Sequence, residues 1–148
     1  MQTAERIRQA LHNMGVKGTP LTRIYRSLYS EDLYLQAYAK IYKNAGALTP
    51  GTDGETADGM SMAKIRDYID LMKQERFRFR PSREKGIPKK SGSIRQLGMP
   101  DFMDKVVQEI VRLMLEAYYE PQFRDSSHGY RAGRGCHTAL KQIKQRFR

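Results

Sequence analysis

The sequence predicts an α+β fold, a mainly helical body that carries a small antiparallel β-hairpin sheet. Apolar residues recur at helical spacing over most of the chain, which indicates several amphipathic helices. Residues 86–100 form two short extended segments around a glycine-containing turn, which is typical of a hairpin. The 148 residues, 39% of them hydrophobic, are enough for one domain with its own core.

Three helical segments are predicted before residue 46. Thr3 is placed to cap a first helix, which runs to about Asn13 and ends at Gly15. The next two helices are predicted over 22–28 and 31–44. Five tyrosines recur at spacings of four or five: Tyr25, Tyr29, Tyr34, Tyr38 and Tyr42. This stripe favours packing with hydroxyls at the rim, and stacking on nucleobases is the alternative.

The middle of the chain alternates between turns, helix and extended segments. Residues 47–60 contain three glycines and one proline and predict a long loop, which in a compact domain is usually functional or mobile. Ser61 caps a helix to about Glu75. Cations and aromatics then alternate over 76–81, which predicts a strand with one apolar and one guanidinium face.

The predicted hairpin leads into the longest helix. Gly92 can take the positive φ of the tight turn, with Lys89 and Lys90 before it and Arg95 after it. Asp101 is placed to cap a helix that reaches about Tyr119. This helix has two apolar rows: Phe102, Val106, Ile110, Leu113 and Ala117, and beside them Met103, Val107, Met114 and Tyr118. We expect it to be the core, and a second row left partly bare would favour a homodimer.

The charge pattern points to an anionic partner. The formal net charge is +11, and the stretch 73–95 holds nine lysines and arginines against two glutamates. Phosphate is the natural counterpart of such cations, and a solvated basic turn is the bland alternative. No apolar run reaches the ~20 residues that span a bilayer, so no membrane partner is expected. The single cysteine, Cys136, fits a reducing compartment, and we expect a cytoplasmic protein.

Three motifs carry a family resemblance. Ile87-Pro88-Lys89 to Arg95-Gln96-Leu97-Gly98-Met99-Pro100, followed by Asp104-Lys105-Val106-Val107-Gln108, resembles the first fingers motif of group II intron reverse transcriptases. The run His128-Gly129-Tyr130-Arg131-Ala132-Gly133-Arg134-Gly135-Cys136-His137-Thr138-Ala139-Leu140 is similar to their second motif, and Pro50-Gly51-Thr52-Asp53-Gly54-Glu55 looks like their motif 0. The motifs follow the family's order and cover roughly residues 45–140.

The resemblance implies a domain plan and a function. Residues 1–148 would be the fingers domain, divided into an N-terminal helical extension (1–46), the motif 0 loop (47–60), the helix, hairpin and core helix (61–119), and the motif 2 loop with the start of the next helix (120–148). The palm and thumb would be absent. Reverse transcription and a maturase role in splicing of the intron are the implied activities. A non-catalytic module that recognises structured RNA is the alternative.

The same resemblance implies site residues. Lys89 and Arg95 would contact the triphosphate of the incoming deoxynucleotide. The residues implied to bind RNA or the template strand are Pro50, Gly51, Asp53, Gly54, Arg76, Arg78, Arg80, Arg83, Lys85, Lys90, Tyr130, Arg131, Gly133 and Arg134. The motif 0 loop would cover the template through its backbone amides.

Cofactor expectations follow from the carboxylates. Polymerase chemistry needs carboxylates that converge on magnesium, and no paired aspartates on a strand occur in this sequence. We therefore expect no cofactor bound by this chain, magnesium in the full-length enzyme, and no polymerisation by the chain alone. His128, Cys136 and His137 supply only three potential zinc ligands and predict no zinc site.

Overall fold

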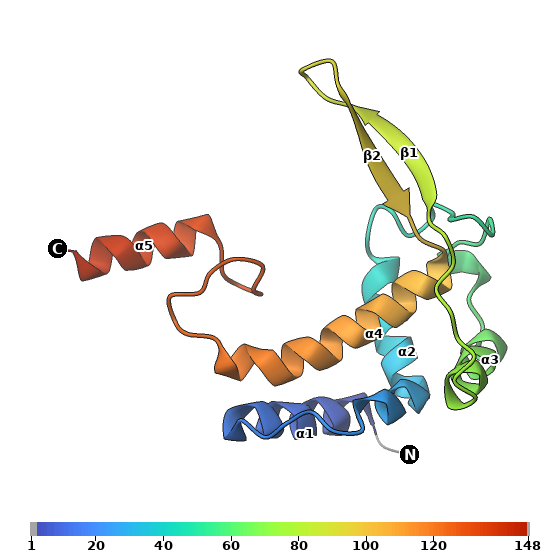
Figure 1. The fold of residues 1–148 in the computed structure, drawn as a ribbon, viewed down its shortest axis with the longest axis horizontal. Coiled ribbons are helices and arrows are strands. Elements are labelled where there is room, and N and C mark those ends of the chain that lie inside the picture. The colour runs from blue at the N-terminus through green and yellow to red at the C-terminus, as the bar shows by residue number, and fades with distance from the viewer. Residues whose placement is uncertain (1–2, 148) are drawn as a thin grey trace.

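The computed structural model describes residues 3–147 and confirms the α+β class (Figure 1). The elements in chain order are α1 (Ala4–Lys17), η1 (Ile24–Tyr29), α2 (Glu31–Tyr42), η2 (Ala57–Gly59), α3 (Met62–Lys73), β1 (Arg83–Pro88), β2 (Ile94–Met99), α4 (Phe102–Tyr119), η3 (Glu120–Gln122) and α5 (Cys136–Arg146), where η marks a 3₁₀ helix. No helix within residues 3–147 is long and apolar enough to cross a membrane.

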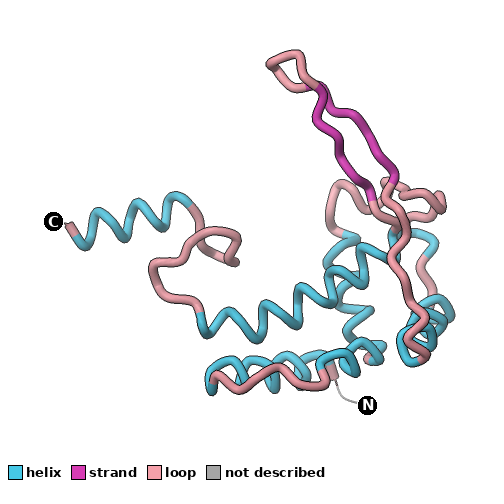
Figure 2. The backbone as a smooth tube through the Cα atoms, viewed as in Figure 1, coloured by secondary structure: helices cyan, strands magenta, loops and turns pink. Residues whose placement is uncertain are grey.

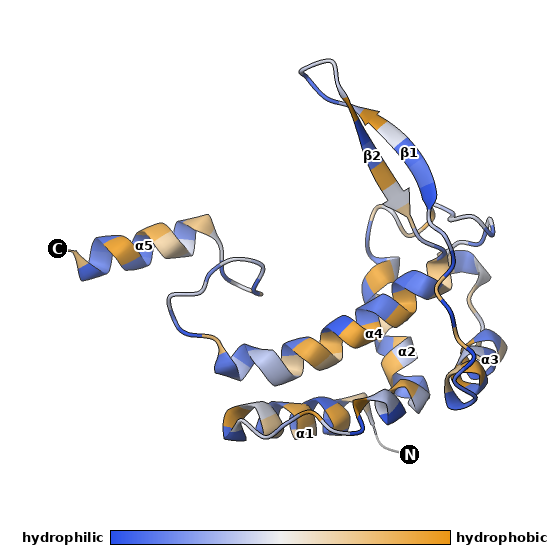
Figure 3. Ribbon diagram, in the orientation of Figure 1, coloured by the Kyte–Doolittle hydropathy of each residue, from blue (hydrophilic) through white to orange (hydrophobic). Residues whose placement is uncertain are grey.

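Helix α4 is the centre of the core. Helix α1 lies alongside it and α2 packs across it, and hydrophobic residues recur along the lengths of both α1 and α4 (Figures 1 and 3). The first predicted apolar row of α4 is buried at Phe102, Val106 and Ile110. The second row is buried throughout: Met103, Val107, Met114 and Tyr118. The reason given for a homodimer, a bare second row, is therefore wrong, because α1 and α2 cover it.

Helix α1 begins as predicted and ends later. The Thr3 hydroxyl accepts a hydrogen bond from the Arg6 amide at 3.4 Å. The helix does not end at Gly15 but continues to a left-handed Gly18, with φ of 63°. Gly15 has a different role, because a Cβ there would overlap the backbone oxygen of Tyr118. The missing side chain lets α1 approach α4 closely.

The next two segments agree with the sequence only in part. Helix α2 is confirmed, but the segment predicted as a helix over 22–28 is a 3₁₀ helix. Six residues between a left-handed Arg23 and an extended Ser30 are too few for a stable α-helix. The tyrosine stripe packs at Tyr34, which is fully buried, and at Tyr38, which meets Phe102 edge to face.

The prediction of a strand over 76–81 is wrong. The segment has no regular secondary structure and no partner strand, and β1 pairs only with β2 in the part of the chain described here. Its two aromatics pack on each other, Phe77 also contacts Tyr68, and the Arg80 amide donates to the Asp104 carboxylate at 2.9 Å. Helix α3 is confirmed, and the Ser61 hydroxyl caps it.

The predicted hairpin is confirmed and projects from the body (Figure 2). The Gly92 amide donates to the Lys89 carbonyl at 3.0 Å, and Gly92 has the positive φ that the turn requires, 81°. At the other end of α4, a connector over 120–135 leads to α5, which lies apart from the helical body (Figures 1 and 2). The body therefore presents the hairpin and α5 at opposite ends of one long helix.

Candidate nucleic-acid interface

The hairpin has one cationic face. In an antiparallel pair, residues directly opposite each other share a face, and the face alternates along the strand. Arg83 is opposite Met99, and Lys85 is opposite Leu97. Arg95 is opposite Ile87 and therefore lies on that same face. The one acidic residue of the strands, Glu84, is on the other face.

Two lysines extend this charge into the turn. The Lys89 amide donates to the Ser93 carbonyl at 2.8 Å, which continues the ladder and keeps Lys89 in register with the cationic face. Lys90 follows in the turn itself. We call Arg83, Lys85, Lys89, Lys90 and Arg95 the hairpin cations.

The hairpin cations have no internal counter-charge. Among residues 3–147, none of the five forms an ion pair with a carboxylate, and Arg83 contacts only the Met99 sulfur, at 4.0 Å. Some cations elsewhere are paired, as Lys73 is with Asp70 at 3.1 Å, and others, such as Arg76 and Arg78, are not. Like charges on one small sheet repel each other, so an external anion would stabilise this arrangement.

A cleft of about 600 Å³ lies between the hairpin, the end of α2 and the loop that follows it. Its lining is mostly apolar, with two lysines, Lys85 and Lys105, and no acidic residue. The Lys105 ammonium donates to the Thr49 carbonyl at 3.0 Å, and burial lowers its pKa. The cationic side of the hairpin thus borders an apolar surface.

The loop over 47–60 is fixed by the carboxylate of Asp101, the residue that was predicted to cap α4. Asp101 is 1% exposed and makes no cap hydrogen bond to α4. Its Oδ1 accepts from the Thr52 amide at 2.5 Å, the Thr52 hydroxyl at 2.8 Å and the Asp53 amide at 3.2 Å. Two of the amides expected to meet a template strand are therefore already occupied.

The pKa of the Asp101 carboxyl reflects this setting. Burial acts to raise the pKa, but the hydrogen bonds from Thr52 and Asp53, together with the charge of Arg80, outweigh it and hold the pKa below its ordinary value. The carboxylate is thus kept ionised. Neighbouring Asp104 shows the opposite balance, because burial raises its pKa despite the hydrogen bond from the Arg80 amide.

Arg80 differs from the hairpin cations. Its Nη1 lies 3.6 Å from the Asp53 carboxylate and 3.7 Å from that of Asp101. Arg76 and Arg78 have no carboxylate partner in the described chain. Arg76 instead donates a hydrogen bond to the Gln74 side chain, and Arg78 donates to the carbonyls of Glu75 and Phe77. The predicted RNA-binding arginines of this segment are therefore in two different electrostatic environments.

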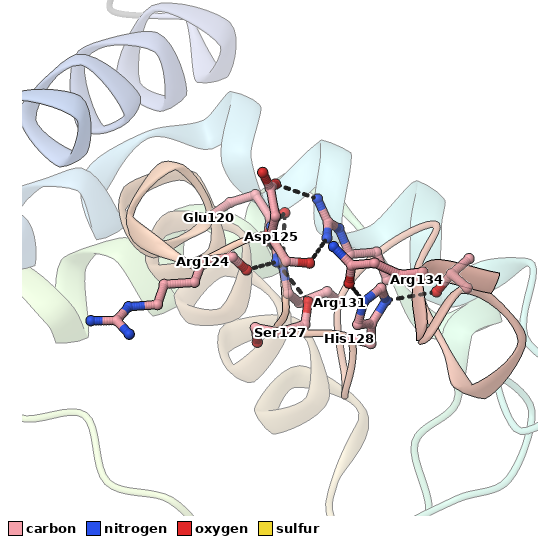
Figure 4. A network of polar contacts seen from close by, with 9 residues as sticks. Glu120, Arg124, Asp125, Ser127, His128, Arg131 and Arg134 are labelled. Atoms are coloured by element: carbon pink, nitrogen blue, oxygen red, sulfur yellow. Dashed lines mark hydrogen bonds and ion pairs between the residues drawn. The ribbon is translucent and has the colours of Figure 1, made fainter. Parts of the chain in front are cut away.

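Arg131 holds the 120–135 connector together (Figure 4). Its guanidinium pairs with Glu120 at 2.6 Å and donates to the Ser127 carbonyl at 2.8 Å and the Arg124 carbonyl at 3.1 Å. Its side chain is only 7% exposed and stacks over the Phe123 ring. The hydrogen bonds from Arg131 lower the pKa of the Glu120 carboxyl.

Other residues of the connector differ in exposure. Arg134 pairs with Asp125 at 3.3 Å, whereas the Arg124 side chain points away from this network (Figure 4). Tyr130 is fully exposed and has a left-handed backbone, with φ of 56°. Such a backbone is unfavourable for a side chain of this size, so the surrounding loop must impose it, and the ring itself faces solvent.

His128 attaches the connector to α5. Its two ring nitrogens meet the Thr138 hydroxyl at 2.8 Å and the Gln142 side chain at 2.7 Å. Thr138 also closes the start of α5, because its hydroxyl accepts from the Gly135 amide at 2.9 Å.

The acidic residues at the base of the hairpin do not fit a metal ion. Asp53, Asp101 and Asp104 face the Arg80 side chain and backbone, and loop donors occupy Asp101 Oδ1. No cluster of three or more histidine, cysteine, aspartate or glutamate side chains in residues 3–147 is arranged to hold a metal.

Fold and site together define an α+β module with a projecting hairpin, one face of which carries cations that have no carboxylate partner in the described chain. No protein-family model matches the chain. The chain is 49% identical over 127 residues to group II intron-encoded protein LtrA of Lactococcus lactis subsp. cremoris. The aligned residues are 85% of this chain and 21% of LtrA. A 91 kDa protein in the cob intron of Schizosaccharomyces pombe is 44% identical over 137 residues, 89% of this chain and 17% of that protein.

A shorter match covers 48 residues of nuclear intron maturase 1 of Arabidopsis thaliana, at 42% identity over 32% of this chain and 7% of the maturase. The chain spans about a fifth of the length of the first two relatives. It belongs to the family of group II intron-encoded proteins, as its three motifs predict.

Proposed function

We propose that this chain is the fingers part of a group II intron reverse transcriptase, which contacts RNA and the incoming deoxynucleotide. The observation that carries the proposal is the cationic face of the hairpin, with five cations and no carboxylate partner in the described chain. Lysine and arginine in this arrangement suit phosphate groups, which an RNA strand and a nucleoside triphosphate both supply.

Lys89 and Arg95 are the proposed triphosphate contacts. By the register, Arg95 is two residues beyond Ser93, the residue opposite Lys89, and such diagonal neighbours on one face are about 7–8 Å apart. Two long cationic side chains at that spacing can hold one polyphosphate between them. They would neutralise its charge and orient it, which is a positioning and electrostatic role.

RNA contacts are proposed for the remaining exposed groups. Arg83, Lys85 and Lys90 continue the charge of the hairpin, and Arg76 and Arg78 lie in the segment that leads to it. Tyr130, held outward, offers a ring on which a base can stack. The intron-encoded and maturase names of the relatives support intron RNA as a partner alongside a template strand.

The remaining predicted contacts are proposed to act through structure. Arg80, Arg131 and Arg134 are each within ion-pair distance of a carboxylate, so they would shape the loops that meet RNA. Pro50, Asp53 and Gly54 would form the loop surface, and the buried Gly51 would let the loop pack against Asp101. Gly133 would form a turn of the connector, with φ of 69°.

Magnesium is proposed for the whole enzyme only. When bound, it would neutralise phosphate charge and activate the attacking oxygen. The described residues offer no fitting carboxylate set, so we assign none of them to it. Their proposed work is to bind and orient phosphates.

A matched pair of variants tests the proposal. The hairpin variant carries Lys85→Ala, Lys89→Ala and Arg95→Ala. The control carries Arg8→Ala, Arg66→Ala and Lys73→Ala, three exposed cations that already pair with carboxylates. Both lose three charges, so any difference reports position rather than net charge. We expect fluorescence anisotropy with a labelled RNA duplex to show a much larger loss for the hairpin variant. Equal losses would reject the hairpin as the interface.

A further inference from the structure

We propose that Asp101 is a positioning residue for RNA binding: with Arg80 it clasps the 50–54 loop against the base of the hairpin and so presents both to one RNA strand. The clasp rests on the proposed function for its RNA partner, but its geometry stands independently. It joins three segments that are far apart in sequence, namely the loop, the 74–82 linker and the start of α4.

Asp101 is placed where it can set the angle between loop and hairpin. Strand β2 ends at Met99, and α4 begins at Phe102, so Asp101 lies in the short junction between them. Its side chain reaches a loop 49 residues earlier and accepts three hydrogen bonds there. Any movement of this junction must therefore move or break those three contacts.

Gly51 shows how tightly the loop is seated. A Cβ at this position would overlap the Asp101 carboxylate and lie 2.6 Å from its Cα and 2.7 Å from its amide nitrogen. Backbone atoms cannot move aside cheaply, so this contact needs glycine. Gly46, earlier in the same chain segment, has no atom within 4 Å of such a Cβ.

Arg80 connects the clasp to the other strand. It lies three residues before β1, and its guanidinium faces both Asp53 and Asp101. The second oxygen of Asp101 is buried without a hydrogen-bond donor within the described residues, so Arg80 is the cation that balances it. Both strands of the hairpin thus begin or end at the clasp.

The ends of the loop are held separately. The Ala57 amide donates to the Ala47 carbonyl at 3.2 Å, and Lys105 holds the Thr49 carbonyl. Glu55 pairs with Lys64 at 2.7 Å. Loss of the Asp101 hydrogen bonds therefore releases the middle of the loop and leaves its ends attached, so variants of the clasp should still fold.

The sign of the effect separates positioning from charge. Asp101→Asn removes a negative charge, which by electrostatics alone strengthens RNA binding. We expect binding to weaken by about tenfold, because asparagine loses the negative charge that strengthens the three hydrogen bonds and balances Arg80. The slope of log affinity against log salt should not change, because all hairpin cations remain. Asp67→Asn, an exposed aspartate on α3, is the matched control and should not weaken binding.

A second variant removes one donor without changing charge. Thr52→Val should weaken RNA binding in the same direction but less, and Thr56→Val is its control. Amide hydrogen exchange measured by NMR gives the independent readout in Asp101→Ala, which removes the acceptor oxygen that asparagine would keep, so the Thr52 and Asp53 amides should lose protection.

The outcomes separate the two proposals. Unchanged or stronger RNA binding by Asp101→Asn, with the variant folded by circular dichroism, would overturn the positioning role. Retained protection of the two amides in Asp101→Ala would overturn the clasp itself. Failure of the unmodified chain to bind RNA would reject the proposed function and with it the role in RNA binding, while the exchange data would still decide the clasp.

Discussion

Replacing Gly15 by alanine tests the packing on which the whole site is mounted. A Cβ at residue 15 would overlap the Tyr118 carbonyl oxygen and lie 2.9 Å from Pro121 Cγ and 3.0 Å from the Tyr118 carbonyl carbon. Two of these three atoms are backbone, so α1 must move away from α4. The shift would also strain the hydrogen bond from the Tyr118 hydroxyl to the Thr19 carbonyl, at 2.8 Å.

The expected magnitude has two opposing parts. Alanine in a helix interior is favoured over glycine by about 1 kcal/mol. Forcing extra volume into a packed contact costs about 1–3 kcal/mol, and more where backbone must shift. Because the close atoms here are mostly backbone, we expect the cost to exceed the gain and the free energy of unfolding to fall by about 1–2 kcal/mol.

Urea unfolding followed by circular dichroism measures this change, with Gly46→Ala as the control because its Cβ meets open space. The control should lie within about 0.5 kcal/mol of the unmodified chain. An equal or higher stability for Gly15→Ala would refute the close approach of α1 and α4.

The other predictions concern charge. If the five hairpin cations each contact one phosphate of a duplex, log affinity should fall with log salt at a slope near −4.5. The affinity would then fall about 500-fold between 50 and 200 mM salt. A slope near zero would rule out nucleic acid as the partner. Lys89→Ala and Arg95→Ala should be made in a longer, polymerase-active protein that contains this chain. They should raise KM for deoxynucleotide or lower kcat more than they weaken RNA binding. Weaker RNA binding with unchanged nucleotide kinetics would contradict this role. The Glu120 pKa is lowered in the folded chain, so its stabilising pair with Arg131 is fully present above the ordinary value of 4.5 and is lost as pH falls through the folded pKa. Proteolysis of the connector should therefore speed up in acid, and a Glu120→Gln variant that keeps the full pH dependence would contradict the assignment.

Local signals predicted the elements whose cause is local. The Gly92 turn and the Ser61 cap each depend on residues within a few positions, and both are confirmed. The strand over 76–81 failed because alternation of cations and aromatics says nothing about a partner strand. Without one, Phe77 and Phe79 pack on each other and the segment stays irregular.

Asp101 shows why the rest of the site was out of reach. An aspartate one residue before a helix is a typical N-cap, and nothing near it in sequence argues otherwise. Its actual donors come from Thr52 and Asp53, which only the folded chain brings to it. The glycine at position 51 was the one local hint, and its reason, the close approach of Asp101, is visible only in the fold.

The arginines of the basic run also differ in ways that only the fold reveals. In sequence, Arg80 and Arg83 belong to one basic run, and a count of charge treats them alike. In the fold, two carboxylates face Arg80 and none faces Arg83 in the described chain. If all nine cations of the 73–95 stretch met phosphate, the salt slope would approach about −8, whereas the hairpin cations alone give about −4.5. One titration therefore decides whether the interface is the whole basic run or the single face of the hairpin.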